Sequence, residues 1–135
     1  MENNFDIQIP YVEHMGMRLL EKADGKARVG FEPKAEHFNS WKTVHGGVLM
    51  GLLDVAMGTA SRALDATCIG AATVEMKTNF ISGAQGPVFT DALALWAGRS
   101  LIFAEAQMTD MAGTLLAKAT GTFKLIYPKS AEPEP

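Results

Sequence analysis

The chain has 135 residues, of which 47% are hydrophobic and 20% are charged, and its net charge at pH 7 is -3. This length and composition suit one globular domain with one apolar core, and the absence of a run of Lys or Arg excludes a basic face for nucleic acid. The single cysteine, Cys68, excludes an intrachain disulfide framework.

The two ends of the chain bear on its location and domain organisation. The N-terminus lacks the basic start and apolar stretch of a secretory signal, and the longest apolar segment, residues 48–57, is too short to span a bilayer. We therefore expect a soluble, cytoplasmic protein with no membrane partner. Residues 128–135 are proline-rich and charged, which predicts a disordered tail after a single domain at residues 1–127.

The first structural signal is a hairpin. The pair Asp24-Gly25 lies between two extended segments within residues 19–32, and such a pair is typical of a tight turn between strands. The first two strands should therefore pair antiparallel. Residues 34–44 are polar and irregular, which indicates a loop, and this loop contains Asn39.

Residues 46–64 have a helical pattern, because small and apolar residues continue for about five turns without a proline. Apolar residues cover every side of this helix. We therefore expect the helix to be buried all round, in the middle of the domain.

Four segments of strand character follow the helix, at residues 72–82, 87–97, 100–110 and 114–126, with turn signals between them. In the last segment polar residues alternate with small ones, the pattern of a sheet with one wet face. The order of two strands, one long helix and four strands predicts an α+β fold, in which a curved antiparallel sheet wraps around a central helix.

Asp54 lies in the middle of the predicted helix. Its neighbours three and four residues away are Met50, Gly51, Met57 and Gly58, none of which pairs with a carboxylate. An unpaired buried charge is costly, so this position requires an explanation. Asp54 could act as a general base. Alternatively, it is a structural residue that meets a basic group or backbone donors from elsewhere in the fold.

The triplet His45-Gly46-Gly47 opens the same helix. Glycines at this point leave the first backbone N–H groups uncovered, so a ligand oxygen can approach the positive end of the helix dipole. This is the geometry of an oxyanion site. The alternative is that the glycines serve a tight loop and that the histidine is structural.

The spacing of these two features indicates a shared site. Nine residues of helix from His45 to Asp54 advance about 13 Å and turn the side chain to roughly the opposite face. One chain therefore cannot bring both residues to one reaction centre. If both are catalytic, a symmetric dimer with antiparallel helices would place the start of one helix against the middle of the other and form two equivalent sites.

The combined pattern resembles a known family. Asn39 precedes His45-Gly46-Gly47 by six residues, Asp54 follows nine residues after His45, and Thr73-Val74-Glu75-Met76 begins the next strand. This pattern resembles the phenylacetate-degradation (PaaI-like) branch of the hotdog-fold thioesterases, over nearly the whole chain. The resemblance implies a hotdog fold and an acyl-CoA thioesterase with no cofactor or metal, since CoA is part of the substrate. It also implies a homotetramer built as a dimer of dimers, with active sites at the dimer interface.

The resemblance further implies a role for each matching residue. The backbone N–H of Gly46 would bind the thioester carbonyl oxygen, and the Asn39 amide would help to hold that carbonyl or the attacking water. Asp54 would act as general base on water, or as nucleophile, and the Thr73 hydroxyl would orient that water. His45 would orient the loop and lie near the thioester sulfur.

Two residues in the same region have simpler alternatives. Thr73 could be an ordinary β-branched strand residue. Glu75 is a second acidic candidate, because other hotdog thioesterases use a glutamate, but we expect it on a solvated strand face.

The phosphates of CoA need local positive charge. Arg99 and Ser100, in a turn between two strands, are the best-placed candidates, with Lys77 and then Lys118 and Lys124 behind them. A positive charge in a turn can also be simply solvated.

Two other functions stay open for this pattern. One is a hydratase or dehydratase of the same fold, which would rely on a His paired with an acid at other positions. The other is a non-catalytic, regulatory protein that binds acyl-CoA without turnover. For a thioesterase, the sequence leaves open aryl versus fatty acyl groups, the chain length, and water activation versus a covalent anhydride.

Overall fold

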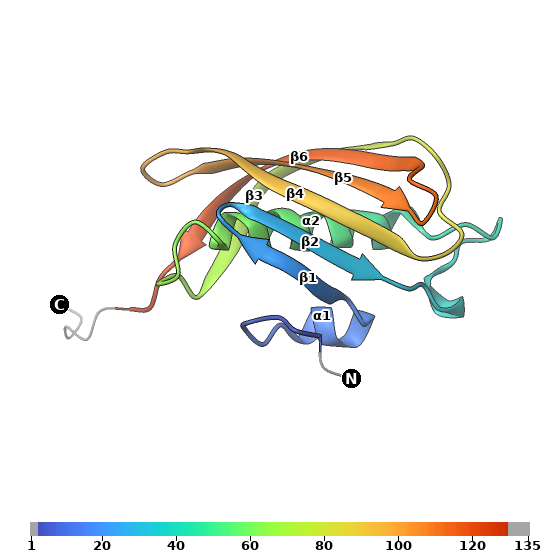
Figure 1. The fold of residues 1–135 in the computed structure, drawn as a ribbon, viewed down its shortest axis with the longest axis horizontal. Helices are drawn as coiled ribbons and strands as arrows, with labels where there is room; N and C mark the ends of the chain where they lie inside the picture. The colour runs from blue at the N-terminus through green and yellow to red at the C-terminus, as the bar shows by residue number, and fades with distance from the viewer. Residues whose placement is uncertain (1–2, 130–135) are drawn as a thin grey trace.

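A six-stranded antiparallel sheet wraps around one long helix in the computed structural model, which describes residues 3–129 (Figure 1). The elements are α1 (Pro10–Met15), β1 (Arg18–Ala23), β2 (Lys26–Phe31), the 3-10 turn η1 (Ala35–His37), α2 (Gly46–Arg62), β3 (Gly70–Phe80), β4 (Val88–Ala97), β5 (Ile102–Asp110) and β6 (Leu115–Ile126). The strand order is β1-β2-β4-β5-β6-β3, which makes β1 and β3 the two edges. The predicted α+β fold is confirmed, and the predicted helix and the four strands after it differ from the observed ones by two residues or fewer at each end.

The predicted hairpin is confirmed at Asp24 and Gly25. Both residues have positive φ, 52° and 77°, which a two-residue turn of the primed type requires at its two central positions. A side chain at position 25 would also crowd a residue just after α2, since a Cβ built there would lie 3.0 Å from Cδ2 of the partly exposed Leu64. Glycine therefore serves both the turn and the packing.

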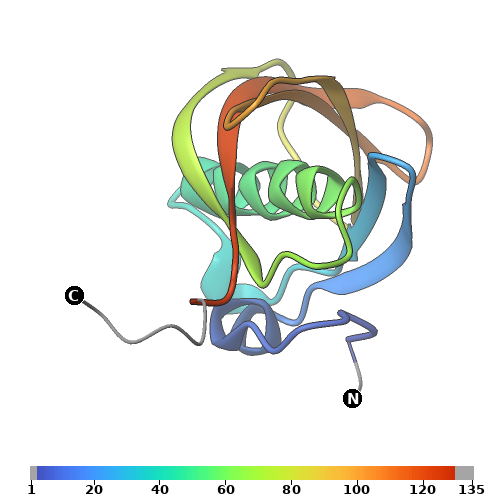
Figure 2. The same cartoon turned by 90° about the vertical axis from the view of Figure 1, so that its left-hand side faces the viewer.

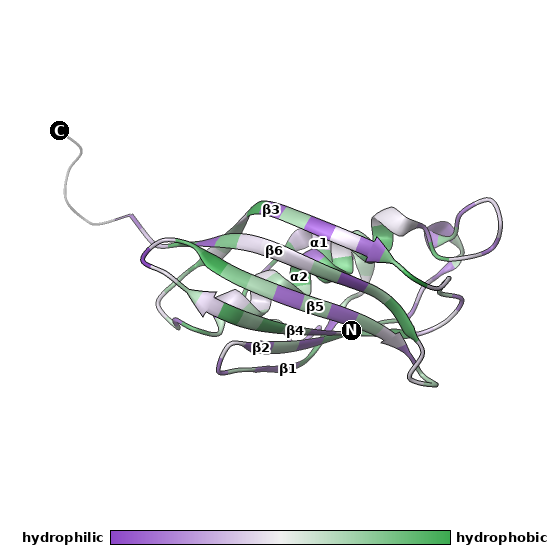
Figure 3. Cartoon of the chain, turned by 90° about the horizontal axis from the view of Figure 1, so that it is seen from above, coloured by the Kyte–Doolittle hydropathy of each residue, from purple (hydrophilic) through white to green (hydrophobic). Residues whose placement is uncertain are grey.

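The strand alternation predicted for β6 is also confirmed. Ala117, Ala119, Gly121 and Phe123 are buried against α2, and the polar residues between them lie on the outer face. Figure 3 views this outer face, where hydrophilic residues interrupt the strands. The absence of a side chain at Gly121 allows close packing, because a Cβ there would lie 2.8 Å from the Phe123 ring and 3.2 Å from Met57 Cε.

The prediction that α2 is buried all round is wrong for the single chain. The face towards the middle of the sheet is buried, but on the side between the β3 edge and α1, Gly51, Asp54, Val55 and Gly58 are only partly covered, and Met50 is 36% exposed. Figure 2 shows the reason: the sheet surrounds α2 on three sides, and the short helix α1 lies across the remaining side between the two edges. One face of an apolar helix is therefore accessible.

An ion pair fixes the N-terminal segment to the end of α2. Arg62 Nη1 donates to Asp6 Oδ1 at 3.0 Å, and Arg62 is only 4% exposed. Lys22 of β1 also donates to Asp6. Burial by itself raises the pKa of Asp6, but the hydrogen bonds from Lys22 and Arg62 outweigh burial, so this pKa lies below its ordinary value of 3.8.

Replacing Asp6 with Asn should lower the free energy of unfolding at pH 7 by about 1–2 kcal/mol, because Arg62 stays buried without a counter-charge while the 45% exposure of Asp6 limits the loss. Since the folded pKa of Asp6 is lowered, the difference from wild type should be full above pH 3.8 and disappear as the pH falls through the folded pKa. Denaturant titrations at several pH values measure it. Glu36→Gln, at an exposed carboxylate, is the control, and a difference that does not vary with pH would contradict the ionic origin.

The structure describes only part of the C-terminal segment for which disorder was predicted. The predicted disordered tail, residues 128–135, lies outside the described residues from residue 130 onward. Within residues 3–129, every helix is too short or too polar to cross a membrane.

Candidate active site

Asp54 and Thr73 meet on the accessible side of α2. Thr73 Oγ1, near the start of β3, donates to Asp54 Oδ1 at 2.6 Å. Asp54 Oδ2 receives no hydrogen bond from any side chain or backbone group of residues 3–129. The carboxylate therefore has one oxygen fixed by a hydroxyl and a second oxygen available to another group.

A bulge in β3 orients Thr73. Thr73 stands opposite Phe123, whose side chain is buried against α2, so Thr73 faces the helix. The register shifts between Thr73 and Glu75, and Glu75 stands opposite Thr122 on the outer face, as expected for a solvated residue. Bulges often re-aim side chains next to functional sites. Here the bulge at Val74 separates the two candidate residues onto different faces.

The start of α2 offers a free backbone donor. His45 is the N-cap, and its Nδ1 accepts a hydrogen bond from Gly47 N at 2.8 Å. The N–H of Gly46 has no acceptor within the described part of the chain. It lies beside the Phe80 ring, which is 3.4 Å from where a Cβ of residue 46 would stand. This N–H points from the positive end of a 17-residue helix and can bind a ligand oxygen.

Asn39 holds the loop before α2. Its Oδ1 accepts from the backbone N–H groups of Trp41 and Thr43, both at 3.1 Å, and its Nδ2 donates to Thr43 Oγ1 at 2.7 Å. An amide nitrogen carries two hydrogens, so one remains for a ligand. The loop is joined to the helix start, since His45 N donates to His37 O at 2.8 Å. Asn39 thus stabilises the loop and retains one donor.

The donor at Gly46 and the carboxylate of Asp54 lie far apart in one chain. Eight residues of α2 separate them, which is about 12 Å along the helix axis at 1.5 Å per residue. A thioester or ester carbonyl and its attacking oxygen are much closer together than this. A single chain therefore does not bring these two groups to one reaction centre.

The residues predicted to bind CoA phosphates lie elsewhere. Arg99 and Ser100 are exposed in the turn between β4 and β5, at the end of the molecule opposite the start of α2 (Figure 1). Lys77 stands opposite Thr120 in β6, between the inward-facing Ala119 and Gly121, so it lies on the outer face of β3. Neither position is beside Asp54 in the same chain.

Two residues that the sequence did not indicate also border the site. Phe80, at the end of β3, lies against Gly46, and Tyr11 of α1 lies against Gly51, where a Cβ would be 2.2 Å from Tyr11 Oη. Forty residues separate Tyr11 from Gly51, so no local pattern connects them. Only the path of the chain around α2 brings them together.

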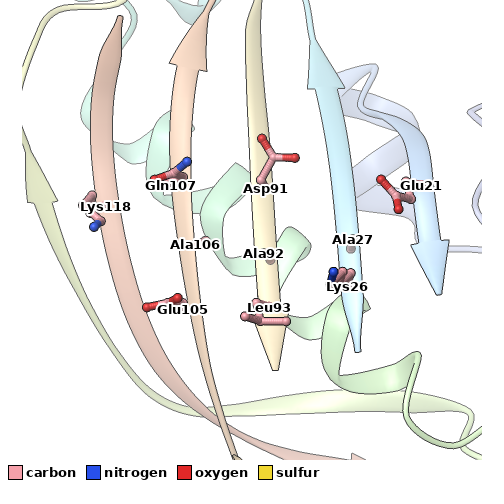
Figure 4. Close-up of a pocket in the computed structure, with 10 residues that line it drawn as sticks. All are labelled: Glu21, Lys26, Ala27, Asp91, Ala92, Leu93, Glu105, Ala106, Gln107 and Lys118. Carbon is pink, nitrogen blue, oxygen red and sulfur yellow. The ribbon is translucent and has the colours of Figure 1, made fainter. Parts of the chain in front are cut away.

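A separate hollow of about 310 Å³ lies on the outer face of the sheet (Figure 4). Its lining carries both charge signs, with three acidic residues, Glu21, Asp91 and Glu105, and two basic ones, Lys26 and Lys118. Of the predicted site residues it contains only Lys118, the weaker candidate for a CoA phosphate.

Within residues 3–129, no group of three or more His, Cys, Asp or Glu side chains could hold a metal ion.

Comparisons with known proteins identify the wider group. Residues 42–118 match the family described as the thioesterase superfamily. A conserved protein of Pseudomonas aeruginosa, PA5202, is 32% identical over 89% of this chain and 96% of that chain, with a TM-score of 0.83. A mutant of the phenylacetic acid degradation protein PaaI from Thermus thermophilus is 26% identical over 87% and 99%, with a TM-score of 0.78. The protein smu.793 from Streptococcus mutans UA159, bound to acetyl-CoA, is 19% identical over 96% and 100%, with a TM-score of 0.80, a likeness of fold alone.

Proposed function

Because this chain belongs to the thioesterase superfamily and has its hotdog fold, as its resemblance to PaaI-like proteins predicted, we propose that it is an acyl-CoA thioesterase. It hydrolyses the thioester bond of an aryl- or fatty-acyl-CoA to a free acid and CoA. The observation that carries this proposal is the Asp54 carboxylate, with one oxygen held by Thr73 and the other available on the accessible face of α2. The S. mutans protein holds acetyl-CoA, so a protein of this fold accommodates a CoA thioester.

The reaction follows from these groups. Asp54 accepts a proton from water, and the water oxygen forms a bond to the thioester carbonyl carbon. The carbonyl electron pair moves onto oxygen, where the Gly46 N–H stabilises it, with the remaining Asn39 hydrogen as a second donor. When the carbonyl re-forms, the carbon–sulfur bond breaks, and the CoA thiolate receives the proton that Asp54 took from the water, which restores the carboxylate. Direct attack by Asp54, through an anhydride that water then hydrolyses, is the second route open to this carboxylate.

His45 has a supporting role in this scheme. Its Nδ1 is occupied by the Gly47 N–H, so a neutral His45 carries its proton on Nε2. That N–H lies at the start of α2, next to the Gly46 donor. It would approach the thioester sulfur.

Two chains build each site in this proposal, because Gly46 and Asp54 of one chain are about 12 Å apart. Edge strand β3 supplies the surface for the second chain. It pairs with β6 on one side only, and its exposed apolar residues include Val74 at 57% and Phe80 at 53%. Antiparallel pairing of two β3 strands around a two-fold axis covers these residues and extends both sheets.

The same two-fold axis orients the helices. Two α2 helices related by this pairing run antiparallel, which moves the start of one towards the middle of the other. Gly46 of one chain then faces Asp54 of the other, and two equivalent sites result. Dimers of this kind would pair again into the tetramer that the family resemblance implies.

The CoA end of the substrate fits the same arrangement. The turn between β4 and β5, which contains Arg99 and Ser100, lies at the end of the molecule where α2 finishes (Figure 1). In an antiparallel dimer this end approaches the start of the partner helix. Arg99 would therefore bind phosphates of a CoA whose thioester lies at the Gly46 N–H of the other chain, with Ser100 as an additional donor. Lys77, on the outer face of β3, would contact a CoA phosphate only if the nucleotide part of CoA crosses this edge strand.

The direct test is thiol release by the purified wild-type protein from a panel of acyl-CoA and aryl-CoA thioesters, followed with a thiol-reactive chromophore. We expect one thiol per acid formed, and the ratio of kcat/KM values across the panel identifies the preferred acyl class. Binding of the esters without thiol release would instead support the regulatory protein. Addition of water to an enoyl-CoA without thiol release would support the hydratase.

A further inference from the structure

Helix α1 places one tyrosine at the accessible face of α2. Pro10 begins α1, and Gly16, with φ of 78°, ends it. Val12 and Met15 are buried, which anchors α1 on the core, while Tyr11 is 45% exposed. Figure 2 shows α1 below α2, on the side that the sheet leaves open. Tyr11 therefore borders the same opening as Asp54.

Glycine at position 51 makes room for the Tyr11 hydroxyl. A Cβ built on Gly51 would lie 2.2 Å from Tyr11 Oη and 3.2 Å from Tyr11 Cζ, so the hydroxyl occupies the space of a side chain at residue 51. Gly51 and Asp54 are three residues apart, and residues at this spacing are neighbours on one helix face. The hydroxyl thus lies one helical turn from the carboxylate.

The electrostatics keep this hydroxyl a donor. Burial raises the pKa of Tyr11, and the negative charge of Asp54 raises it further, so Tyr11 stays protonated at neutral pH. Among residues 3–129, the structure gives its hydroxyl no hydrogen-bond partner. An unused donor and the unused Oδ2 of Asp54 therefore lie on the same face, without bonding to each other.

We propose that Tyr11 is a positioning residue, whose hydroxyl donates a hydrogen bond to the attacking water while Asp54 accepts that water's proton. The inference rests on the proposed thioesterase function. A water molecule has two hydrogens and two lone pairs. One hydrogen goes to Asp54 Oδ2 and the other to Thr73 Oγ1, which already donates its own hydrogen to Asp54 Oδ1. One lone pair accepts from Tyr11, so the other points at the thioester carbon.

The test is a double-mutant cycle on kcat and KM. Tyr11→Phe keeps the ring and removes the hydroxyl, and it should lower kcat about tenfold with KM unchanged, because only the water loses a contact. Gly51→Ala adds the Cβ that displaces the hydroxyl, and it should cost at least as much. With the oxygen absent in the double variant, the tightest contact of the added Cβ is with the ring carbon Cζ at 3.2 Å, which a small shift of the partly exposed ring relieves, so the double variant should be about as slow as Tyr11→Phe alone.

Gly58→Ala is the matched control. It also adds a methyl group to the partly covered side of α2, but its Cβ meets only ordinary contacts, the nearest at 3.7 Å, so kcat should equal wild type. If Gly51→Ala does not fold, the kcat of Tyr11→Phe is compared with that of Gly58→Ala, and this comparison alone tests the role of the Tyr11 hydroxyl. Wild-type kcat in Tyr11→Phe, a change in KM alone, or independent losses in the two single variants would overturn the proposal. Absence of thiol release from the wild type would instead overturn the thioesterase function, and the role of Tyr11 with it.

Discussion

Asp54→Asn should lower kcat for thioester hydrolysis by at least about a thousandfold, with a much smaller change in KM. Asparagine keeps the shape of the side chain, and its carbonyl oxygen can still accept the hydrogen bond from Thr73. Its amide nitrogen cannot accept the proton of the attacking water, and it cannot form an anhydride. The base and nucleophile routes are therefore both lost, while the surface that binds the substrate is retained.

Glu75→Gln is the matched control for this substitution. Glu75 lies only two residues beyond Thr73, but it faces the outer side of β3, so its neutral variant should retain wild-type kcat. Thiol release under saturating thioester, with thermal unfolding as a check of folding, compares the two variants. Residual activity above about a tenth of wild type in Asp54→Asn would assign the chemistry to another group and leave Asp54 a structural residue.

Gly46→Pro should lower kcat about a hundredfold to a thousandfold, because proline removes the backbone N–H that stabilises the developing oxyanion. Proline suits this place in the chain. It is favoured at the first position of a helix, and His45 has ψ of 134°, which is compatible with a following proline. Gly46→Ala keeps the N–H, and its Cβ meets the Phe80 ring at an ordinary 3.4 Å, so it should remain near wild type. Equal losses in both variants would mean that bulk, and not the N–H, matters.

The same variant can show whether the site is shared between chains. Co-expression of differently tagged Asp54→Asn and Gly46→Pro chains allows mixed dimers to be purified. In a shared site, one of the two centres combines the intact Gly46 of the first chain with the intact Asp54 of the second. Mixed dimers should then regain about half of the wild-type rate. If no activity is recovered, Gly46 and Asp54 of the same chain would have to act on one substrate, which would contradict the antiparallel arrangement.

Local patterns in the sequence were sufficient for the elements of the fold. The Asp24-Gly25 turn, the helix that begins at Gly46, and the alternation along β6 each depend on residues that are neighbours in the chain. Backbone sterics and side-chain period act over a few residues, so sequence spacing alone predicts these elements. The position of Asp54 within the helix, and its distance from Gly46, follow from the same geometry.

Tertiary structure decided which groups surround Asp54. Thr73 reaches it because a bulge in β3 turns that side chain inward, and Tyr11 reaches Gly51 because α1 crosses the gap between two sheet edges. The exposure of one face of α2, against the expectation of complete burial, has the same origin, since six strands do not close around the helix. These contacts depend on how the sheet curves and where its edges lie, which many residues distant in the chain determine together. The sequence by itself thus identified the carboxylate and the helix start, and the family resemblance suggested Thr73, but only the folded chain showed the hydrogen bond from Thr73 and the approach of Tyr11.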